Sequence, residues 1–258
     1  MNIRVLGAHN CESQDSKLIS LLIDDVLVID AGGLTSSLSF SAQQRLRAIL
    51  LTHQHYDHVR DIPTLGMNLF LEGSTINIYS TASVYETISS HLLGGKLYPN
   101  FLERPPNNPT VKFTIIEPYQ LKQIEGYSIL AVPVNHPGPA VGYQVTSPDD
   151  KTVFYTADTG PGLASCWEHV SPQLLIIEVT MPNRYEEAAA QAGHLTPSLL
   201  KQELASFQEV KGYLPRVVLV HMNPNLEEEI EAEIAIVAKA LNSSITLAYE
   251  GMQLQLYK

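Results

Sequence analysis

Lys and Arg are scarce in this chain. The sequence has 16 of them against 27 Asp and Glu, a formal net charge of −11 over 258 residues, and it holds no basic cluster. Affinity for long nucleic acids comes mainly from Lys and Arg at phosphates, so we expect no such partner. The densest acidic run, residues 227–233, lies on an expected helix whose apolar residues recur at helical spacing. Its glutamates are therefore expected to form a solvated face.

Long apolar runs and cysteines are also lacking. No apolar stretch reaches the ~18 residues that cross a bilayer, so we expect no membrane partner. Cys11 and Cys166 are the two cysteines of the chain; a disulfide between them stays open but unsupported, and a reducing cytoplasm is the simpler setting. Residues 1–7 look like a strand rather than a secretory signal, which agrees with a cytoplasmic location.

The composition is that of an ordinary globular protein. Hydrophobic residues make up 45% of the chain and charged residues 17%, and 258 residues suffice for one large core. The sequence contains no internal repeat and no linker, and the segment rich in Pro and Asn at residues 99–109 is expected to be a loop. Residues 1–258 are therefore expected to form a single domain.

Apolar runs and helical periodicity predict strands that alternate with helices. The expected strands cover residues 3–6, 18–23, 26–30, 48–51, 111–117, 127–134, 141–146, 152–156, 174–178, 217–220, 246–248 and 253–257. The expected helices cover residues 41–47, 63–71, 83–93, 196–207 and 226–241. Asp24 and Asp25 are expected to turn a tight hairpin between the second and third strands.

The most informative segment is residues 52–58 (THQHYDH), directly after the apolar run 48–51. It places three imidazoles and one carboxylate at the end of an expected strand. Neutral imidazole together with carboxylate suits zinc, iron or manganese, whereas calcium prefers an all-oxygen shell. Adjacent Asp57 and His58 cannot easily point where His53 and His55 point. The spacing therefore favours two metal ions side by side.

This segment resembles the HxHxDH signature of the metallo-β-lactamase superfamily, and three residues further along match the rest of that family's ligand set. His136, Asp158 and His221 each follow an apolar, strand-like run, where a buried sheet can hold a side chain at its rim. The resemblance implies a fold of the α/β (α+β) class: a four-layer αββα sandwich, with two mixed sheets face to face and helices outside. The order of the expected elements fits that fold.

The resemblance also implies two divalent metal ions, zinc by default, although the same ligands accept manganese or iron. Seven side chains would hold them in two sets that share one carboxylate: His53, His55 and His136 on one ion, Asp57, His58 and His221 on the other, and Asp158 on both. Asp57 also belongs to the catalytic set that the resemblance implies. A water shared by two dications roughly 3.5–4 Å apart loses a proton near neutral pH, so the chain is expected to be a hydrolase.

A second pair of motifs resembles the phosphodiesterase branch of the superfamily, which includes ribonuclease Z and the class II cyclic-nucleotide phosphodiesterases. These motifs are Glu-x-Thr at residues 178–180 and Gly-His-x-Thr at residues 193–196. The resemblance implies that His194 protonates the leaving group and that Glu178 orients its ring. A purely structural ion pair is the alternative. Thr196 and Pro197 are expected to begin the next helix.

Within that branch the sequence is most similar to the class II cyclic-nucleotide phosphodiesterases. The expected substrate is therefore a small anionic phosphodiester, a 3′,5′-cyclic nucleotide, attacked by a hydroxide held between the metals. Residues 137–157 alone separate His136 from Asp158, which leaves no room for the tRNA-gripping arm of ribonuclease Z. Relatives commonly form dimers, so a homodimer is open.

Several positions beside the expected pocket depart from the family pattern and leave the substrate open. Tyr56 replaces an expected Leu, residues 59–62 lack an expected small residue, and residues 7–10 lack the usual glycine pattern. Tyr56 either stacks on a base or fills the rim, and His9 is expected in the core or on the surface rather than at the pocket. The alternatives are another phosphoesterase or an arylsulfatase-like activity, a ribonuclease Z-like hydrolase, and a non-catalytic di-iron sensor.

Overall fold

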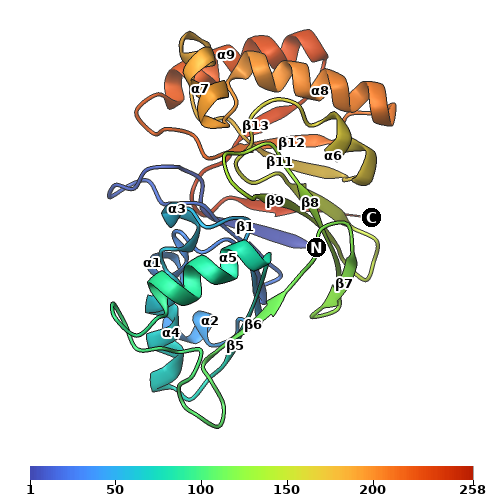
Figure 1. Ribbon diagram of the computed structural model, residues 1–258. Helices are drawn as coiled ribbons and strands as arrows, with labels where there is room; N and C mark the ends of the chain where they lie inside the picture. The colour runs from blue at the N-terminus through green and yellow to red at the C-terminus, as the bar shows by residue number, and fades with distance from the viewer. Residues whose placement is uncertain (258) are drawn as a thin grey trace.

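Two seven-stranded sheets face each other across an apolar core within residues 1–257, the part of the chain that the computed structural model describes. Helices cover the outer side of each sheet (Figure 1). Both sheets mix parallel and antiparallel pairs. The predicted four-layer αββα sandwich is confirmed.

The first sheet has the strand order β14-β1-β2-β3-β4-β5-β6. Pairing is antiparallel from β14 to β3 and parallel from β3 to β6. The strands are β1 (Asn2–Gly7), β2 (Ser20–Ile23), β3 (Leu27–Ile29), β4 (Ala48–Leu50), β5 (Ile76–Ser80), β6 (Val111–Ile115) and β14 (Gln253–Gln255).

The second sheet has the strand order β13-β12-β11-β10-β9-β8-β7. Pairing is parallel from β13 to β10 and antiparallel from β10 to β7. The strands are β7 (Leu121–Ile124), β8 (Tyr127–Pro133), β9 (Val141–Thr146), β10 (Thr152–Tyr155), β11 (Leu174–Glu178), β12 (Arg216–Val220) and β13 (Ile245–Leu247). The parallel strands lie under helices on one side and the other sheet on the other, which explains why β11 is buried at every position.

Helices from the two halves of the chain cover different sheets (Figure 1). The first sheet carries α1 (Leu34–Ser37), α2 (Phe40–Gln43), α4 (Ile62–Leu71) and α5 (Ala82–Thr87), which continues as one π-helical turn, Ile88–Leu92. The second sheet carries α6 (Ala164–His169), α7 (Glu186–Ala192), α8 (Pro197–Lys211) and α9 (Glu227–Leu241), with a 3₁₀ turn at Asn183–Tyr185. The short α3 (Tyr56–Val59) follows β4 and enters the functional site.

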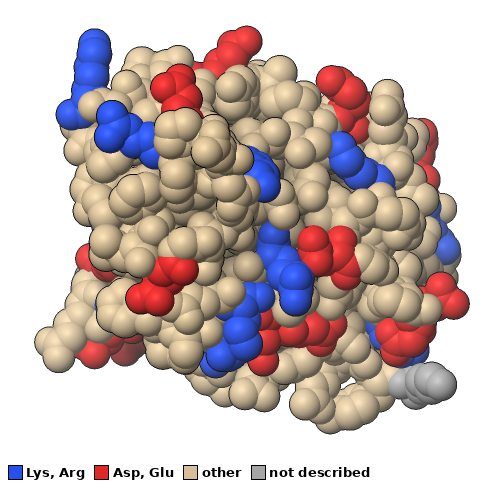
Figure 2. Space-filling model, turned by 90° about the horizontal axis from the view of Figure 1, so that it is seen from below, with Lys and Arg blue, Asp and Glu red and all other residues tan. Residues whose placement is uncertain are grey.

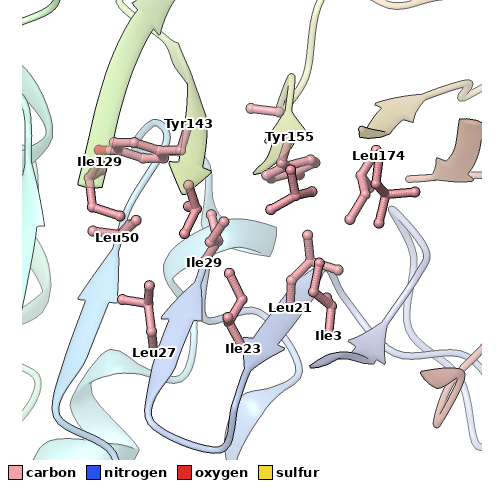
Figure 3. Close-up of a cluster of buried hydrophobic side chains, with 14 of the residues drawn as sticks. Ile3, Leu21, Ile23, Leu27, Ile29, Leu50, Ile129, Tyr143, Tyr155 and Leu174 are labelled. Carbon is pink, nitrogen blue, oxygen red and sulfur yellow. The ribbon is translucent and has the colours of Figure 1, made fainter. Parts of the chain in front are cut away.

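Side chains from both sheets interlock in the central core, shown in Figure 3. Ile23, Ile29 and Leu50 of the first sheet face Tyr143 and Tyr155 of the second, and all five are buried. Each such aliphatic side chain removed from water contributes roughly 1.5–3 kcal/mol. The core fixes how the two sheets stack, and therefore how the loops at their shared edge meet.

The predicted strands and the longer predicted helices are confirmed, with ends that differ by a few residues. Asp24 and Asp25 form the predicted hairpin turn, with φ of 46° and 60°. Thr196 is the predicted N-cap of α8, and its side chain accepts a hydrogen bond from the Leu199 N–H. Residues 99–109 form no helix or strand, as predicted.

The predicted helix at residues 41–47 is wrong in its second half, because α2 ends at Gln43. The side-chain amide of Gln43 donates to the carbonyl oxygens of Thr35 and Leu38, and the Arg47 N–H donates to Val26 O. The chain therefore leaves the helix to join β3. The sequence prediction also omits β5, β7, α1, α3, α6 and α7.

Among residues 1–257, no helix is both long and apolar enough to cross a membrane. Cys11 and Cys166 are both free thiols, the first exposed and the second buried. The disulfide that the sequence left open between them does not form. On the face shown in Figure 2, Lys and Arg side chains lie among Asp and Glu side chains on a largely uncharged surface. Of the predicted solvated glutamates of α9, Glu228 and Glu231 are exposed. Glu227, Glu229 and Glu233 are only half-exposed, because they bond to His9, Arg184 and the Asn183 N–H.

Candidate metal centre

The segment after β4 carries the first four candidate ligands into the edge where the two sheets meet. β4 is buried throughout, and the chain stays buried through His53. His55 is the N-cap of α3, so Asp57 and His58 lie in the first turn of this helix and project differently from His53. Gly32 lets α3 approach closely, because a Cβ there would lie 1.9 Å from the Asp57 carbonyl oxygen. Asp57 and His58 thus project in a different direction from His53, which agrees with the prediction of two ions.

The remaining three candidate ligands come from the second sheet. Asp158 follows β10, and His221 follows β12, so both lie beyond the carboxyl ends of the two parallel strands that flank β11. His136 follows β8 on a loop that closes over the same edge. Ligand atoms of the seven residues fall into two groups, in each of which they lie within 4.8 Å of one another: His53, His55, His136 and Asp158 in one, and Asp57, His58, Asp158 and His221 in the other.

Asp158 lies between the two groups. One of its carboxylate oxygens is 3.2 Å from Nε2 of His58, and the other is 3.3 Å from Nε2 of His221 and 3.7 Å from Nε2 of His53. The second group is closed by Asp57, whose Oδ2 is 3.1 Å from Nε2 of His221. These groups are the two sets that the sequence resemblance implies, and Asp158 has the position of a carboxylate shared by both.

Four of the histidines are oriented by hydrogen bonds from Nδ1, which turn Nε2 into the cluster. Each acceptor is an oxygen of a neighbouring element: Thr52 Oγ1 for His53 at 3.0 Å, Asp30 Oδ2 for His58 at 2.7 Å, Gly193 O for His136 at 3.0 Å, and Thr180 Oγ1 for His221 at 2.9 Å. Such outer partners fix the tautomer and raise the basicity of a metal-binding imidazole. The sequence prediction does not include Asp30 and Thr52.

Asp30 stabilises the orientation of these histidines through hydrogen bonds. It is fully buried after β3, and its carboxylate also accepts hydrogen bonds from the backbone N–H and the hydroxyl of Thr52. One carboxylate therefore positions His58 directly and His53 through Thr52. A sequence signal exists, because Asp30 directly follows an apolar strand as Asp158 does, but one carboxylate among 27 acidic residues does not reveal a partner so far along the chain.

The donor set fits a pair of divalent cations. Nε2 of His53, Nε2 of His58 and Oδ1 of Asp158 are all buried and make no hydrogen bond, because the last two, although 3.2 Å apart, are not aligned for one. Buried polar atoms are almost always paired, so three orphans pointing into one cluster indicate a partner that is not a protein group. Imidazole nitrogens with carboxylate oxygens form the shell that zinc, iron and manganese accept.

The ionisation of the cluster follows from burial and from its mixed charges. Burial lowers the pKa of His53 well below its usual value, with neighbouring His58 adding to the shift, which keeps this ring in the neutral form that binds metals. Burial alone would raise the pKa of Asp158, but His221 and His58 outweigh it and hold the pKa well below the usual range. For Asp57, hydrogen bonding to His221 likewise outweighs burial and lowers its pKa. Both carboxylates are ionised and ready to bind cations.

Glu178 and His194 lie beside the second group. Nδ1 of His194 donates to Oε1 of fully buried Glu178 at 2.7 Å, which leaves Nε2 as the nitrogen available to a substrate. Burial lowers the pKa of His194, but the Glu178 carboxylate outweighs it, and the pKa is raised to about 9. The second Glu178 oxygen accepts from the Thr180 hydroxyl at 2.7 Å, so Glu178 also supports His221 through Thr180.

An open cleft of 590 Å³ lies over the cluster. Its lining combines candidate ligands with side chains of the 8–18 loop and of α3: Asn10, Cys11, Glu12, Leu18, His55, Tyr56, Asp57, Arg60, Asp158, His194 and His221. Tyr56 is 64% exposed and Arg60 belongs to the same wall. The sequence prediction assigns no role to Arg60.

Three other histidines lie away from this cleft. His9 is buried and donates to Glu250 at 2.7 Å and to Glu227 at 3.1 Å, which makes it a core residue, one of its two expected places. His91 and His169 are exposed on helices of the outer layers. The structure thus brings together all seven predicted metal ligands and the predicted Glu178–His194 pair, and no further histidine joins them within residues 1–257.

The fold and the clustered ligands define an αββα sandwich protein with a candidate dinuclear metal centre. The sequence profile of the beta-lactamase superfamily domain matches residues 25–222, and the chain belongs to that superfamily. No curated protein matches the chain in sequence.

Solved structures share the whole fold at low sequence identity. Yeast PDE1 has a TM-score of 0.83 at 14% identity, with 99% of each chain covered. Zn(2+)-bound PqqB from Methylobacterium extorquens has a TM-score of 0.74 at 18% identity, covering 99% of this chain and 100% of that one. The short form of human tRNase Z has a TM-score of 0.70 at 20% identity, with 100% of both chains covered. At these identities the similarity establishes the fold and not the substrate.

Proposed function

We propose that this protein is a dinuclear metal-dependent hydrolase that cleaves a phosphodiester, with a small 3′,5′-cyclic nucleotide as substrate. The observation that carries the proposal is the Glu178–His194 pair at the open side of the candidate metal cluster. A hydrolase of this kind needs a nucleophile and a proton donor on opposite sides of the reacting phosphorus, and metal ligands alone supply only the first.

Each residue has a defined part in this proposal. His53, His55 and His136 would hold one divalent cation, Asp57, His58 and His221 the other, and Asp158 both. When bound, the cation pair acidifies a water molecule to a nucleophile and neutralises the phosphate charge. Asp30, Thr52, Gly193 and Thr180 keep the imidazoles in the tautomer that binds.

The protein supplies the leaving-group proton from His194. Glu178 fixes the tautomer with Nδ1 protonated, so Nε2 is the atom that faces the departing oxygen. An alkoxide is a poor leaving group, and a positioned acid accelerates such a step by about 10²–10⁴-fold. This preference for alkoxide departure supports a nucleotide diester over a substrate whose leaving group needs no proton.

The surroundings of the site support a small substrate. The excess of acidic residues disfavours long polyanions, and the 590 Å³ cleft is of the size usual for small-molecule sites. Two proteins of similar fold carry names that refer to such substrates: yeast PDE1 to a phosphodiester, and human tRNase Z to tRNA. This similarity agrees with phosphodiester chemistry. Zinc is our first choice of metal because of the imidazole-rich shell; manganese and iron fit the same donors. Two free thiols agree with a reducing compartment such as the cytoplasm.

The experiment combines elemental analysis of the purified protein with rates on three substrates: a 3′,5′-cyclic nucleotide, a linear aryl diester and an aryl sulfate. We expect about two metal ions per chain and hydrolysis of the diesters in preference to the sulfate. His194→Ala should keep both metals and lose about 10²–10⁴-fold in kcat on the cyclic nucleotide, whereas Asp158→Ala should lose metal. A His194→Ala enzyme that cleaves the cyclic nucleotide at the wild-type rate would rule out the acid.

A further inference from the structure

The cleft over the metal cluster has a second wall that the proposed chemistry does not use. This wall combines the 8–18 loop with the exposed side of α3, and its polar and aromatic members are Asn10, Glu12, Tyr56 and Arg60. The part of the substrate that does not react must lie against it. The side chains of this wall therefore indicate which kind of substituent the diester carries.

Arg60 is the one Lys or Arg that lines the cleft within the described part of the chain, and its charge is already compensated. Its Nε donates to Asp61 Oδ1 at 3.0 Å, and one terminal nitrogen pairs with the carboxylate of Glu12. Asp61 is itself fixed, because its other oxygen accepts hydrogen bonds from the backbone N–H and the hydroxyl of Thr35 at 2.6 and 2.8 Å. The Arg60 side chain is only 18% exposed.

Glu12 consequently decides the charge of the wall. It lines the cleft beside Arg60 and is the more exposed of the two, at 35%, so an incoming anion meets Glu12 together with an arginine that two carboxylates already neutralise. A second negative charge on the substrate would have to displace Glu12 from Arg60. The wall therefore has no free cation for a second anionic group.

Tyr56 gives the same wall an uncovered aromatic face. It is 64% exposed at the first position of α3, directly between candidate ligands His55 and Asp57. An aromatic ring in a cleft wall gains affinity by stacking on a planar group. Asn10 lines the same wall.

We propose that Tyr56 and the Glu12–Arg60 pair determine specificity: they select diesters whose non-reacting substituent is planar and uncharged, and they disfavour a second negative charge. This inference rests on the proposed function and narrows its substrate class. A nucleoside with a single, diester phosphate fits this description, whereas nucleotides with additional phosphates do not.

The test uses metal-loaded protein and 4-nitrophenyl phosphodiesters that share one leaving group. One pair compares a phenyl with a methyl substituent, and the other compares 3-carbamoylphenyl with 3-carboxyphenyl, which are equal in size but differ in charge. Ratios of kcat/KM within each pair are compared between variants, so the intrinsic reactivity of each ester cancels. Tyr56→Leu keeps an apolar side chain without the ring, and Glu12→Gln removes one charge.

We expect Tyr56→Leu to lower the phenyl-to-methyl ratio about fivefold. Glu12→Gln should lower the carbamoyl-to-carboxylate ratio about fivefold, the range of a partly exposed ion pair. The matched controls Tyr119→Leu and Glu228→Gln change an exposed tyrosine and an exposed glutamate that do not line the cleft, and should keep the wild-type ratios. A wild-type phenyl-to-methyl ratio retained by Tyr56→Leu, or an unchanged charge preference in Glu12→Gln, would overturn the assignment.

The proposed function can fail separately. If the metal-loaded protein hydrolyses neither the four diesters nor a 3′,5′-cyclic nucleotide, the hydrolase assignment fails. Calorimetric binding of phenylphosphonate and methylphosphonate then decides the role of the wall. Tighter binding of phenylphosphonate that Tyr56→Leu abolishes upholds the aromatic wall. Equal binding of the two phosphonates to the wild type overturns it.

Discussion

The carbonyl oxygen of Gly193 accepts a hydrogen bond from Nδ1 of His136 at 3.0 Å, which ties a candidate metal ligand to the residue directly before His194. Gly193 is also the C-cap of α7, in the left-handed conformation with φ of 75°. A Cβ at this position would lie 2.2 Å from Cδ of Pro137 and 3.0 Å from Nδ1 of His136. One glycine thus ends a helix, orients a ligand and places the proposed acid.

Gly193→Ala should therefore weaken metal binding and catalysis together. The new methyl group must push the loop at Pro137 away and break the hydrogen bond to His136, a loss of outer support that typically costs 10–100-fold in metal affinity. Zinc affinity by competition with a chelating dye, and kcat/KM on an aryl diester, measure the two effects.

Gly212→Ala is the matched control. Gly212 is the C-cap of α8 with φ of 76°, but nothing lies within 4 Å of a Cβ there. Both alanines carry the left-handed conformational cost of about 1–2 kcal/mol, so both variants should lose stability. Equal metal affinities in the two variants would show that close contact at His136 plays no part.

Asp30→Asn should lower the metal affinity of the group that contains His58. An amide in place of the carboxylate removes the negative charge beside His58 and can present N–H to a ring nitrogen that needs an acceptor. We expect a 10–100-fold loss of affinity at the group that contains His58, and a smaller loss at the group that contains His53, which Asp30 supports through Thr52. Asp25→Asn, in an exposed turn, is the control. Titration calorimetry that resolves two unchanged sites in Asp30→Asn would contradict this role.

The fold is predictable from the sequence where strands are apolar and lead into a polar side chain of the site. β8, β10, β11 and β12 all show this pattern, and all four were predicted. Short or amphipathic elements escape prediction for physical reasons. Helices α6 and α7 have 6 and 7 residues, less than two turns each, and such short helices are stabilised by packing on the second sheet rather than by their own sequence. β7 is an edge strand with exposed residues and a weak apolar pattern.

The candidate site is predictable at its ligands but less so around them. The dense motif at residues 52–58 marks the cluster, and the strand-end positions of His136, Asp158 and His221 complete it. Positioning groups depend instead on contacts between distant segments. The Glu12–Arg60 pair joins residues 48 positions apart, and the Gly193–His136 contact joins residues 57 apart. No periodicity or motif records such pairings.

Buried His9 and its half-buried partners Glu227 and Glu250 should make stability depend on pH. Burial lowers the pKa of His9, but both carboxylates outweigh it, so the net pKa is raised above 6.5. Its stabilisation is therefore fully present below pH 6.5 and is lost as the pH rises through the raised value. Burial raises the pKa of Glu250, but its hydrogen bond from His9 outweighs this and the pKa falls below 4.5. That contribution is present above pH 4.5 and is lost as the pH falls through the lowered value.

His9→Gln should consequently be less stable than the wild type by about 1–3 kcal/mol near pH 5.5, and by less at pH 9. Denaturant unfolding at both pH values, with metal in excess, measures the difference. The control His91→Gln replaces an exposed histidine and should give no such trend. A His9→Gln deficit that grows with pH would reverse the sign of the argument.

Metal removal should destabilise the wild type but not Asp158→Ala. The cluster forms only when β4, β8, β10 and β12 are folded together, so cations bind the folded state alone. At 100 times the dissociation constant, one such ligand adds about 2.7 kcal/mol, and a chain of this size shifts its Tm by about 2–4 °C per kcal/mol. A chelator should thus lower the wild-type Tm by roughly 5–10 °C for each ion lost.

Asp158→Ala removes the carboxylate shared by both groups, so its Tm should already be low and should not respond to the chelator. Differential scanning calorimetry of both proteins tests this, and an equal chelator shift in each would mean that the cations bind elsewhere.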